Sequence, residues 1–308
     1  MEMDKVNYIG DLQRFCTEDG PGIRTTIFFK GCPLNCAWCH NPELLSATFY
    51  LHYSRSKCIQ CGHCIESCLI HAISSGKNGI VIDRDACIAC RQCIEKCCSG
   101  ALYTKSNIYS QEDLIAEIEK DVDFFDNSGG GVTLSGGEVL SSSEYAIGIA
   151  KGVKKKKIAV AIETSGFGNY EELKELAEIC DDILFDIKHM NSELHEKYVG
   201  VSTELIMENL QKLASDLNIR NKITIRVPFI HNVNDDEENV ELLSDFMVVN
   251  GLKKVNLLPY HNMGIHKGKE IGIAQQEFKA PSDEILLRAK RQFFNKGIQV
   301  EILGMDVD

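Results

Sequence analysis

Residues 31–42 read Gly-Cys-Pro-Leu-Asn-Cys-Ala-Trp-Cys-His-Asn-Pro and carry three cysteines in the spacing C-x3-C-x2-C. A loop this short brings three thiolates onto one face of a [4Fe–4S] cube, which normally takes four cysteines. The next cysteine after Cys39 is Cys58, so one iron is left open to a group that is not protein. A zinc loop is the alternative, although zinc sites favour C-x2-C pairs and four ligands. The stretch therefore predicts an open iron–sulfur cluster on Cys32, Cys36 and Cys39.

Composition limits the kind of protein. The 308 residues include 33 Lys and Arg against 45 Asp and Glu, a formal charge of −12, which argues against non-specific nucleic-acid binding. Residues 1–6 have no apolar stretch typical of a secretion signal, and no run reaches the ~20 apolar residues of a membrane span. Of the 14 cysteines, most fall in three tight runs, which in a cytosolic protein indicates metal rather than disulfides. We expect a cytoplasmic protein of an anaerobic host with no nucleic-acid or membrane partner.

Residues 58–68 and 87–97 repeat each other, and each carries C-x2-C-x2-C-x3-C. In bacterial two-cluster ferredoxins this pattern binds two [4Fe–4S] clusters, and the fourth cysteine of each run binds the other cluster. The predicted ligands are Cys58, Cys61, Cys64 and Cys97 for one cluster, and Cys87, Cys90, Cys93 and Cys68 for the other. Cys98 is an alternative to Cys97, and paired zinc knuckles are the alternative for the whole segment.

Strands and helices alternate along the rest of the chain. The predicted strands are 23–29, 132–134, 157–162, 183–185, 222–229, 255–258 and 299–303, and the predicted helices are 110–120, 170–179, 204–217, 236–249 and 282–295. Such alternation predicts a parallel sheet with right-handed crossovers. Six strand–helix units are too few for a closed barrel, so we expect an α/β fold, a partial (βα)6 TIM-like barrel. The expected domains are the barrel, 1–47 with 106–308, and an inserted ferredoxin-like module, 48–105.

Short polar motifs follow several of these strands, where a barrel gathers the carboxyl ends into one mouth. They are Ser135-Gly136-Gly137-Glu138, Glu163-Thr164, Asp186-Ile187-Lys188 and Leu258-Pro259-Tyr260-His261. Together with residues 19–25 (Asp-Gly-Pro-Gly-Ile-Arg-Thr) and the cysteine loop, the chain resembles the glycyl-radical-enzyme activating enzymes of the radical S-adenosylmethionine (SAM) superfamily. The resemblance is to the pyruvate formate-lyase activase-like group with a two-cluster ferredoxin insert, and it covers nearly the whole chain.

The resemblance implies an oxidoreductase. In that family a reduced cluster donates one electron to SAM, which breaks into methionine and a 5′-deoxyadenosyl radical. That radical removes the α-hydrogen of a glycine on a partner glycyl radical enzyme. A low-potential donor, flavodoxin or ferredoxin, is expected to supply the electron, and the cofactors expected are SAM and three [4Fe–4S] clusters.

The predicted site residues combine this resemblance with the chemistry of the side chains. Cofactor contacts are expected from Trp38, Cys39, His40, Gly136, Gly137, Glu138, Asp186, Ile187, Lys188, Arg226 and His261, with Cys32, Cys36 and Cys39 as the catalytic cluster ligands. The two glycines let backbone approach a ligand closely, and Trp38 offers a flat face for adenine. Core packing is the alternative for Trp38 and His261, and surface pairing is the alternative for Asp186 and Lys188. Glu163 with Asp186 resembles a pair that holds a monovalent cation in some activases.

Two other functions fit parts of the sequence. Another radical SAM enzyme, acting on a peptide or a small molecule, usually carries extra cysteines after the barrel, whereas the last cysteine here is Cys180. An iron–sulfur electron carrier would use the ferredoxin-like repeat but would leave the C-x3-C-x2-C loop without a role. Cleavage of SAM by the reduced protein separates an enzyme from an electron carrier. The sequence does not name the partner enzyme.

Overall fold

The structure, a computed structural model, describes residues 8–305 of the chain. The expectation that residues 1–6 lack a secretion signal therefore lies outside the described residues. Within the described part, no helix is long and apolar enough to cross a membrane.

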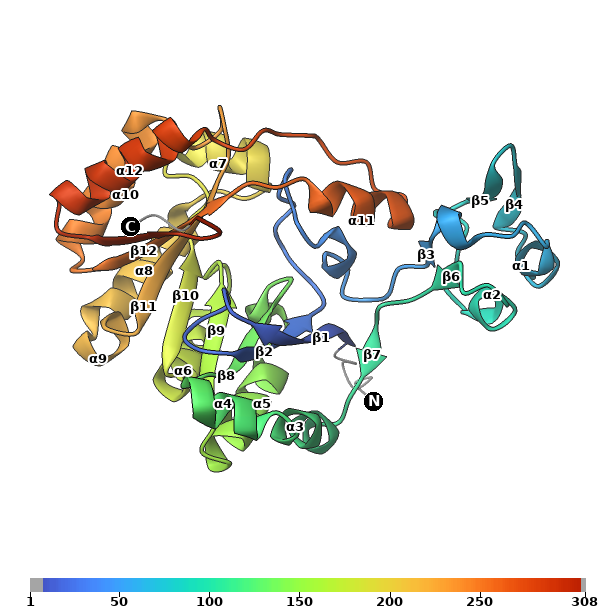
Figure 1. The fold of residues 1–308 in the computed structure, drawn as a ribbon, viewed down its shortest axis with the longest axis horizontal. Helices are drawn as coiled ribbons and strands as arrows, with labels where there is room; N and C mark the ends of the chain where they lie inside the picture. Colours follow the sequence, from blue (N-terminus) through green and yellow to red (C-terminus); the bar gives the residue numbers. More distant parts are fainter. Residues whose placement is uncertain (1–7, 306–308) are drawn as a thin grey trace.

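A nine-stranded sheet forms the centre of the described chain (Figure 1). In order across the sheet its strands are β13 (Gln299–Ile302), β12 (Lys254–Pro259), β11 (Ile223–Phe229), β10 (Asp182–Asp186), β9 (Ala159–Thr164), β8 (Gly131–Gly136), β2 (Arg24–Phe29), β1 (Tyr8–Cys16) and β7 (Asn107–Ile108). The strands from β13 to β2 are parallel to one another, and β1 and β7 pair antiparallel at one side. Because β13 and β7 are the two edges, the sheet of residues 8–305 is open, with the six strand–helix units and final strand that the sequence predicts.

Helices follow the parallel strands along the chain. They are α3 (Gln111–Glu119), α4 (Val122–Ser128), α5 (Ser143–Lys155), α6 (Tyr170–Ile179), α7 (Ser192–Val199), α8 (Glu204–Ser215), α9 (Leu217–Arg220), α10 (Glu237–Val249), α11 (Met263–Ile271) and α12 (Asp283–Asn295). Except for α7 and α11, these helices bury apolar side chains in one large core that they share with the strands, and Leu114, Leu173 and Phe293 are fully or almost fully buried there. This layer of helices leaves the carboxyl ends of the strands free for other contacts.

Capping side chains explain why several helices begin where the sequence predicts. Ser110, Asp236 and Ser282 each accept a hydrogen bond from the backbone amide three residues later, at the starts of α3, α10 and α12. A Ser or Asp at this position satisfies an amide that otherwise has no partner within the helix.

The sequence pattern predicts no strand before residue 23, whereas the structure has β1 over residues 8–16. β1 pairs antiparallel with β2, and its register shifts between Ile9 and Asp11 and again between Gln13 and Cys16. These irregularities break the alternation of apolar and polar side chains that identifies a strand in a sequence. Pairing with β2, and not a local pattern, therefore determines β1.

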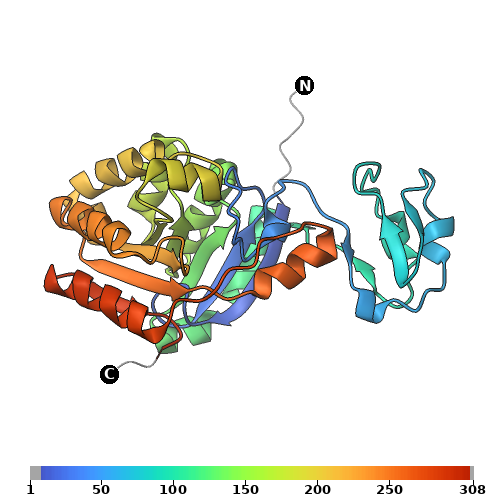
Figure 2. The same cartoon turned by 90° about the horizontal axis from the view of Figure 1, so that it is seen from above.

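Residues 48–105 form a small lobe beside the sheet (Figure 2). Its elements are β3 (His52–Tyr53), α1 (His63–Glu66), β4 (Ile73–Gly76), β5 (Gly79–Ile82), α2 (Gln92–Glu95) and β6 (Leu102–Tyr103). β3 pairs with β6 and β4 pairs with β5, both antiparallel. The lobe has an apolar cluster of its own, which includes Leu51, Ile73 and Leu102.

Helix α11 fastens this lobe to the main sheet domain. The Tyr103 hydroxyl donates to Glu270 Oε2 at 2.6 Å. The Arg84 guanidinium donates to the carbonyl oxygen of Leu51 within the lobe and, at 3.2 Å, to the carbonyl oxygen of Glu270. His52 stacks on Tyr103 with ring centroids 4.8 Å apart. The contacts of Tyr103 and Arg84 with Glu270 therefore join the lobe to helix α11.

His52 should make the protein sensitive to mild acid. Its side chain is 2% exposed, and burial, with the charges of Lys105 and Lys30, lowers the pKa of His52 from 6.5 to about 4. Between these values the unfolded chain binds a proton that the folded chain does not, so stability falls as pH drops from 6.5 and levels off below 4. We expect the thermal midpoint to fall by a few degrees from pH 7 to pH 5. The thermal midpoint of His52→Phe, which keeps an aromatic ring against Tyr103, should fall less over the same pH range. An equal fall in the wild type and the variant would show that His52 is not the cause of the acid sensitivity.

Candidate active site

A cavity of about 550 Å³ opens at the carboxyl ends of the parallel strands. Most residues predicted for the site line it, namely Cys32, Cys36, Trp38, Cys39, His40, Gly136, Gly137, Glu163, Asp186, Lys188, Arg226 and His261. They come from the ends of β2, β8, β9, β10 and β12 and from within β11. Two predicted residues, Glu138 and Ile187, are not part of the lining. The fold thus brings together motifs that are up to 229 positions apart in the chain (Cys32 to His261).

The loop that carries the three cysteines is held by contacts from three parts of the chain. The amides of Asn35 and Ala37 donate to carbonyl oxygens at the end of α7, at 2.8 Å each. The Cys32 amide donates to the carbonyl oxygen of Leu45 at 3.0 Å. Gln275 Nε2 donates to the Cys39 carbonyl oxygen at 2.7 Å. These backbone contacts fix the loop through groups other than the thiols, which leaves the sulfur atoms free to bind a metal.

The chemistry of the three thiols fits a cluster with one open iron. Burial raises the pKa of Cys39 to about 12 and also raises the pKa values of Cys32 and Cys36, so these thiols stay neutral until a metal displaces their protons. Among the described residues that line the cavity there is no fourth cysteine. In a cubane cluster each cysteine binds a different iron. Three sulfurs here would leave the fourth iron facing the cavity.

Gly136 and Gly137 lie where a side chain could not be accommodated. Gly136 has a φ of +120°, and a Cβ there would lie 2.3 Å from the Phe29 amide nitrogen. A Cβ on Gly137 would lie 2.3 Å from the Gly31 carbonyl oxygen. Only glycine therefore lets the end of β8 lie directly against the start of the cysteine loop, and it leaves bare backbone at the cavity wall.

Glu138 was predicted to contact the cofactor, but its side chain does not line the cavity. It accepts hydrogen bonds from Thr164 Oγ1 at 2.5 Å, from the Ser165 amide at 2.8 Å and from Ser165 Oγ at 2.5 Å. The Leu140 amide also donates to it, at 3.2 Å. Burial raises the pKa of Glu138, although these hydrogen bonds oppose the shift. The side chain joins the loops after β8 and β9 and so positions both.

Asp186 and Lys188 form an ion pair inside the cavity, with Lys188 Nζ 2.9 Å from Asp186 Oδ2. Burial alone would lower the pKa of Lys188, but the carboxylate of Asp186 raises it. Lys188 is thus a fixed positive charge beside the cluster thiols. Ile187, between the two, is in the apolar core, and its amide donates to the Arg226 carbonyl oxygen at 2.9 Å. Its side chain therefore makes no contact with the cavity.

Arg226 is 4% exposed and has the acidic partner that its burial requires. Its Nη1 lies 3.4 Å from Glu163 Oε1 and 3.9 Å from Asp19 Oδ1. Nη1 also donates to the Glu18 carbonyl oxygen at 3.2 Å. The second oxygen of Glu163 accepts from Ser135 Oγ at 2.5 Å. Asp19 therefore belongs to this group of charges, a role that its place in the Asp-Gly-Pro-Gly turn did not reveal.

The two aromatic residues of the cysteine loop, Trp38 and His40, have different surroundings. Trp38 is 4% exposed and packs edge-on to Phe278 with centroids 6.0 Å apart, so most of the indole is core. His40 stacks on His261 at 3.9 Å. Burial and the neighbouring His261 lower the pKa of His40 to about 4, which keeps the imidazole neutral. Both histidines line the cavity, stacked on each other.

Helix α11 completes the site, and the sequence analysis assigned no element there. Lys267 Nζ lies 2.5 Å from Asn41 Oδ1. A Cβ on Gly264 would lie 2.4 Å from the Cys39 carbonyl oxygen, so this glycine lets the helix approach the cysteine loop. Two glycines within nine residues weaken the helical signal in the sequence, and packing on the loop decides the helix.

Two hollows in the small lobe are each lined by four thiols. One is lined by Cys58, Cys61, Cys64 and Cys97, and the other by Cys68, Cys87, Cys90 and Cys93. A backbone amide donates to the fourth sulfur of each repeat, from Leu102 to Cys97 at 3.4 Å and from Ala72 to Cys68 at 3.2 Å. These groups are the two ligand sets predicted from the repeat. Cys98 lines neither hollow.

Comparison with known proteins identifies the family to which this cysteine loop and strand order belong. The Radical SAM superfamily matches residues 26–243. The chain is 43% identical over 299 residues to the trans-4-hydroxy-L-proline dehydratase activating enzyme of Clostridioides difficile, covering 96% of this chain and 98% of that one. It is 40% identical over 272 residues to the choline trimethylamine-lyase activating enzyme of Oleidesulfovibrio alaskensis, covering 86% of each.

More distant relatives agree as well. The chain is 33% identical over 304 residues to the pyruvate formate-lyase 2-activating enzyme of Escherichia coli, covering 98% of this chain and 94% of that one. A radical SAM methyltransferase from Sphaerobacter thermophilus has the same fold, with a TM-score of 0.56 at 14% identity over 94% of this chain and 76% of that one. The chain therefore belongs to the radical SAM superfamily and, within it, to the activating enzymes of glycyl radical enzymes.

Proposed function

We propose that this activating enzyme binds SAM in the cavity at the strand ends, on a [4Fe–4S] cluster held by Cys32, Cys36 and Cys39. The observation that carries the proposal is the lining of that cavity, in which three thiols meet bare glycine backbone and an Asp–Lys pair. When bound, the cluster supplies one electron that splits SAM into methionine and a 5′-deoxyadenosyl radical, which takes the glycine hydrogen of the partner enzyme.

The cavity wall offers complementary groups for the polar parts of SAM. The backbone of Gly136 and Gly137 suits the methionine ammonium, because a carbonyl oxygen accepts from it and no side chain blocks its approach. Asp186 and Lys188 provide one acceptor and one donor for the methionine head or the ribose. His40 and His261 offer a flat face beside the cluster. A monovalent cation near Glu163 and Asp186 stays a prediction, since Arg226 already balances the Glu163 charge.

We further propose that residues 48–105 are a ferredoxin-like module with two [4Fe–4S] clusters, inserted into a barrel of residues 1–47 and 106–308. The two four-thiol hollows support this, as do the backbone amides that donate to Cys68 and Cys97. The module contacts α11, which also contacts the cysteine loop. An electron from flavodoxin or ferredoxin could therefore pass through the module to the cavity. Such a set of free thiols suits the reducing cytoplasm.

The reaction can be tested with the reduced, reconstituted protein, SAM and its cognate glycyl radical enzyme. We expect 5′-deoxyadenosine and a persistent doublet in the electron paramagnetic resonance spectrum of the partner, because a glycyl radical is stabilised between an amide nitrogen and a carbonyl. Asp186→Asn should weaken SAM binding about 10–100-fold by losing a charge-assisted hydrogen bond, with the iron content unchanged.

Two controls accompany this experiment. Changing the target glycine of the partner to alanine should abolish the doublet, whereas Glu208→Ala, on an exposed helix face far from the cavity lining, should change nothing. Deoxyadenosine formed with a radical on a small molecule, and with none on any protein, would assign the enzyme to a different reaction.

A further inference from the structure

The two repeats of the small lobe, each taken with the residue that follows its fourth cysteine, differ at two positions that could bind metal. The repeats align at a shift of 29 residues, so that Cys61 corresponds to Cys90. At the position of His63 the second repeat has Gln92, and at the position of Cys98 the first repeat has Leu69. Each repeat therefore has one donor side chain that the other lacks, an imidazole in the first and a thiol in the second.

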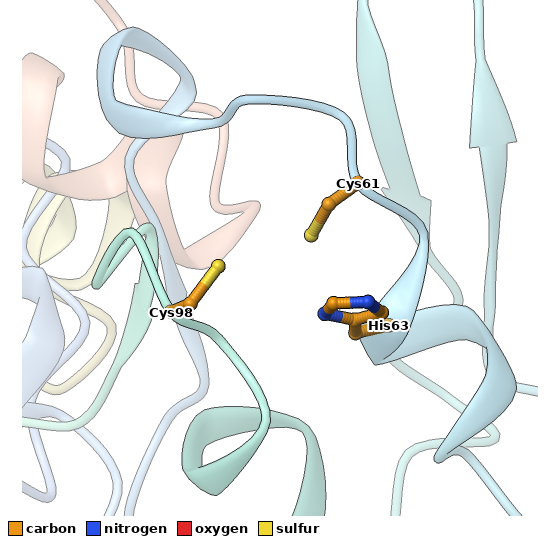
Figure 3. A group of neighbouring side chains, drawn as sticks. All are labelled: Cys61, His63 and Cys98. Atoms are coloured by element: carbon orange, nitrogen blue, oxygen red, sulfur yellow. The ribbon is translucent and has the colours of Figure 1, made fainter.

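The fold brings both extra donors to the same place, although they come from different repeats. The ligand atoms of Cys61, His63 and Cys98 all lie within 4.8 Å of one another, and all three side chains are exposed (Figure 3). Cys61 also lines the hollow with Cys58, Cys64 and Cys97, whereas Cys98 lies outside it. The extra donors thus stand at one corner of one proposed cluster, beside the ligand Cys61.

We propose that Cys98 is a reserve ligand for this cluster and takes the place of Cys61 on its iron. The inference rests on the proposed function, in which the lobe holds two [4Fe–4S] clusters. In the exchange the Cys98 sulfur binds iron as the Cys61 sulfur leaves, and one proton moves from the Cys98 thiol to the Cys61 thiolate. No electron is gained or lost. His63 lies within reach of both sulfurs and adds a nitrogen donor at the same corner.

Exposure explains why a reserve at this corner would be useful. Cys61 is exposed, whereas Cys64 of the same set is buried, and solvent-accessible thiolates are the first to be alkylated or oxidised. A second thiol within 4.8 Å can hold the iron when Cys61 is lost. The other cluster also has an exposed ligand, Cys90, but Leu69 offers it no substitute. The two clusters should therefore tolerate the loss of the corresponding cysteine differently.

Alkylation of the full-length, anaerobically reconstituted protein tests this directly. Iodoacetamide with peptide mass spectrometry should label Cys98 in the wild type, and labelling of Cys98 should fall to background in Cys61→Ala while the cluster is present. Removing the iron with a chelator should restore the labelling. Equal labelling of Cys98 in wild type and Cys61→Ala would overturn the inference, and so would protection of Cys98 in the wild type, which would make it the resident ligand.

Iron content provides the second measurement. Cys61→Ala should keep about 12 Fe per chain and Cys61→Ala/Cys98→Ala about 8, because one of three clusters is then lost. In the other half, Leu69→Ala added to Cys90→Ala should change the iron content no further. Identical iron in Cys61→Ala and the double variant would contradict the reserve ligand. A wild type with only about 4 Fe would instead refute the two-cluster module itself, so the two failures are distinguishable.

Discussion

Changing Cys32, Cys36 and Cys39 together to alanine should abolish SAM cleavage and lower the iron content from about 12 to about 8 per chain. These three are the only thiols in the described lining of the main cavity, so the variant has no remaining thiolate ligand for the cluster that reduces SAM. The eight thiols of the small lobe line separate hollows and should keep their iron. Iron analysis and chromatographic detection of 5′-deoxyadenosine measure the two effects.

A cysteine outside the three runs is the matched control for this variant. Cys16 is in β1 and lines neither the cavity nor either hollow, so Cys16→Ala should keep both iron and activity. Full iron loading of the triple variant, or stoichiometric zinc in the wild type, would show that the C-x3-C-x2-C loop does not hold an iron–sulfur cluster.

Glu138→Ala should be among the most destabilising single substitutions in this protein. The side chain is 2% exposed, and its removal leaves the hydroxyls of Thr164 and Ser165 and the amides of Leu140 and Ser165 without their acceptor. Buried donors left unpaired in a network cost about 3–5 kcal/mol of unfolding free energy. Denaturant unfolding of the variant and the wild type, at matched iron content, measures the difference.

Two further variants show whether the network is the cause. Glu138→Gln keeps the shape of the side chain but offers an NH2 group in place of one acceptor, so its loss of stability should lie between those of wild type and Glu138→Ala. Glu208→Ala, which removes an exposed partner of Lys212, should cost no more than about 0.5 kcal/mol. A loss of less than about 1 kcal/mol in Glu138→Ala would mean that the loops after β8 and β9 hold their places without this carboxylate.

The parallel part of the fold follows from local patterns. Strands such as β11 and β2 are short apolar runs with β-branched residues, and helices such as α10 and α12 start at a capping Asp or Ser. Each of these signals lies within about ten residues, so a single sequence contains it. β1 and α11 lack such a signal because register shifts interrupt one and glycines weaken the other, and each depends on the surface that it packs against.

In the candidate site, too, some residues could be predicted from the sequence and others could not. The spacing of the cysteine loop predicts its metal, whereas Gly136, Gly137, Asp186 and Lys188 were predicted from the resemblance to the activating enzymes together with the chemistry of these residues. The sequence did not specify where Glu138 points, since its partners Thr164 and Ser165 belong to the next strand. In the same way, only the fold placed Asp19 beside Arg226 and Gln275 on the Cys39 carbonyl.

By itself the sequence determined the family, the order of the parallel strands, and the sets of thiols that could bind metal, because spacing and periodicity are properties of neighbours along the chain. The tertiary structure decided that the ligand atoms of Cys98, Cys61 and His63 lie within 4.8 Å of one another and that Cys98 lines neither four-thiol hollow. Contacts between residues far apart in sequence depend on how whole elements pack. That packing is set by the combined burial and hydrogen bonding of many residues, and no short stretch carries it.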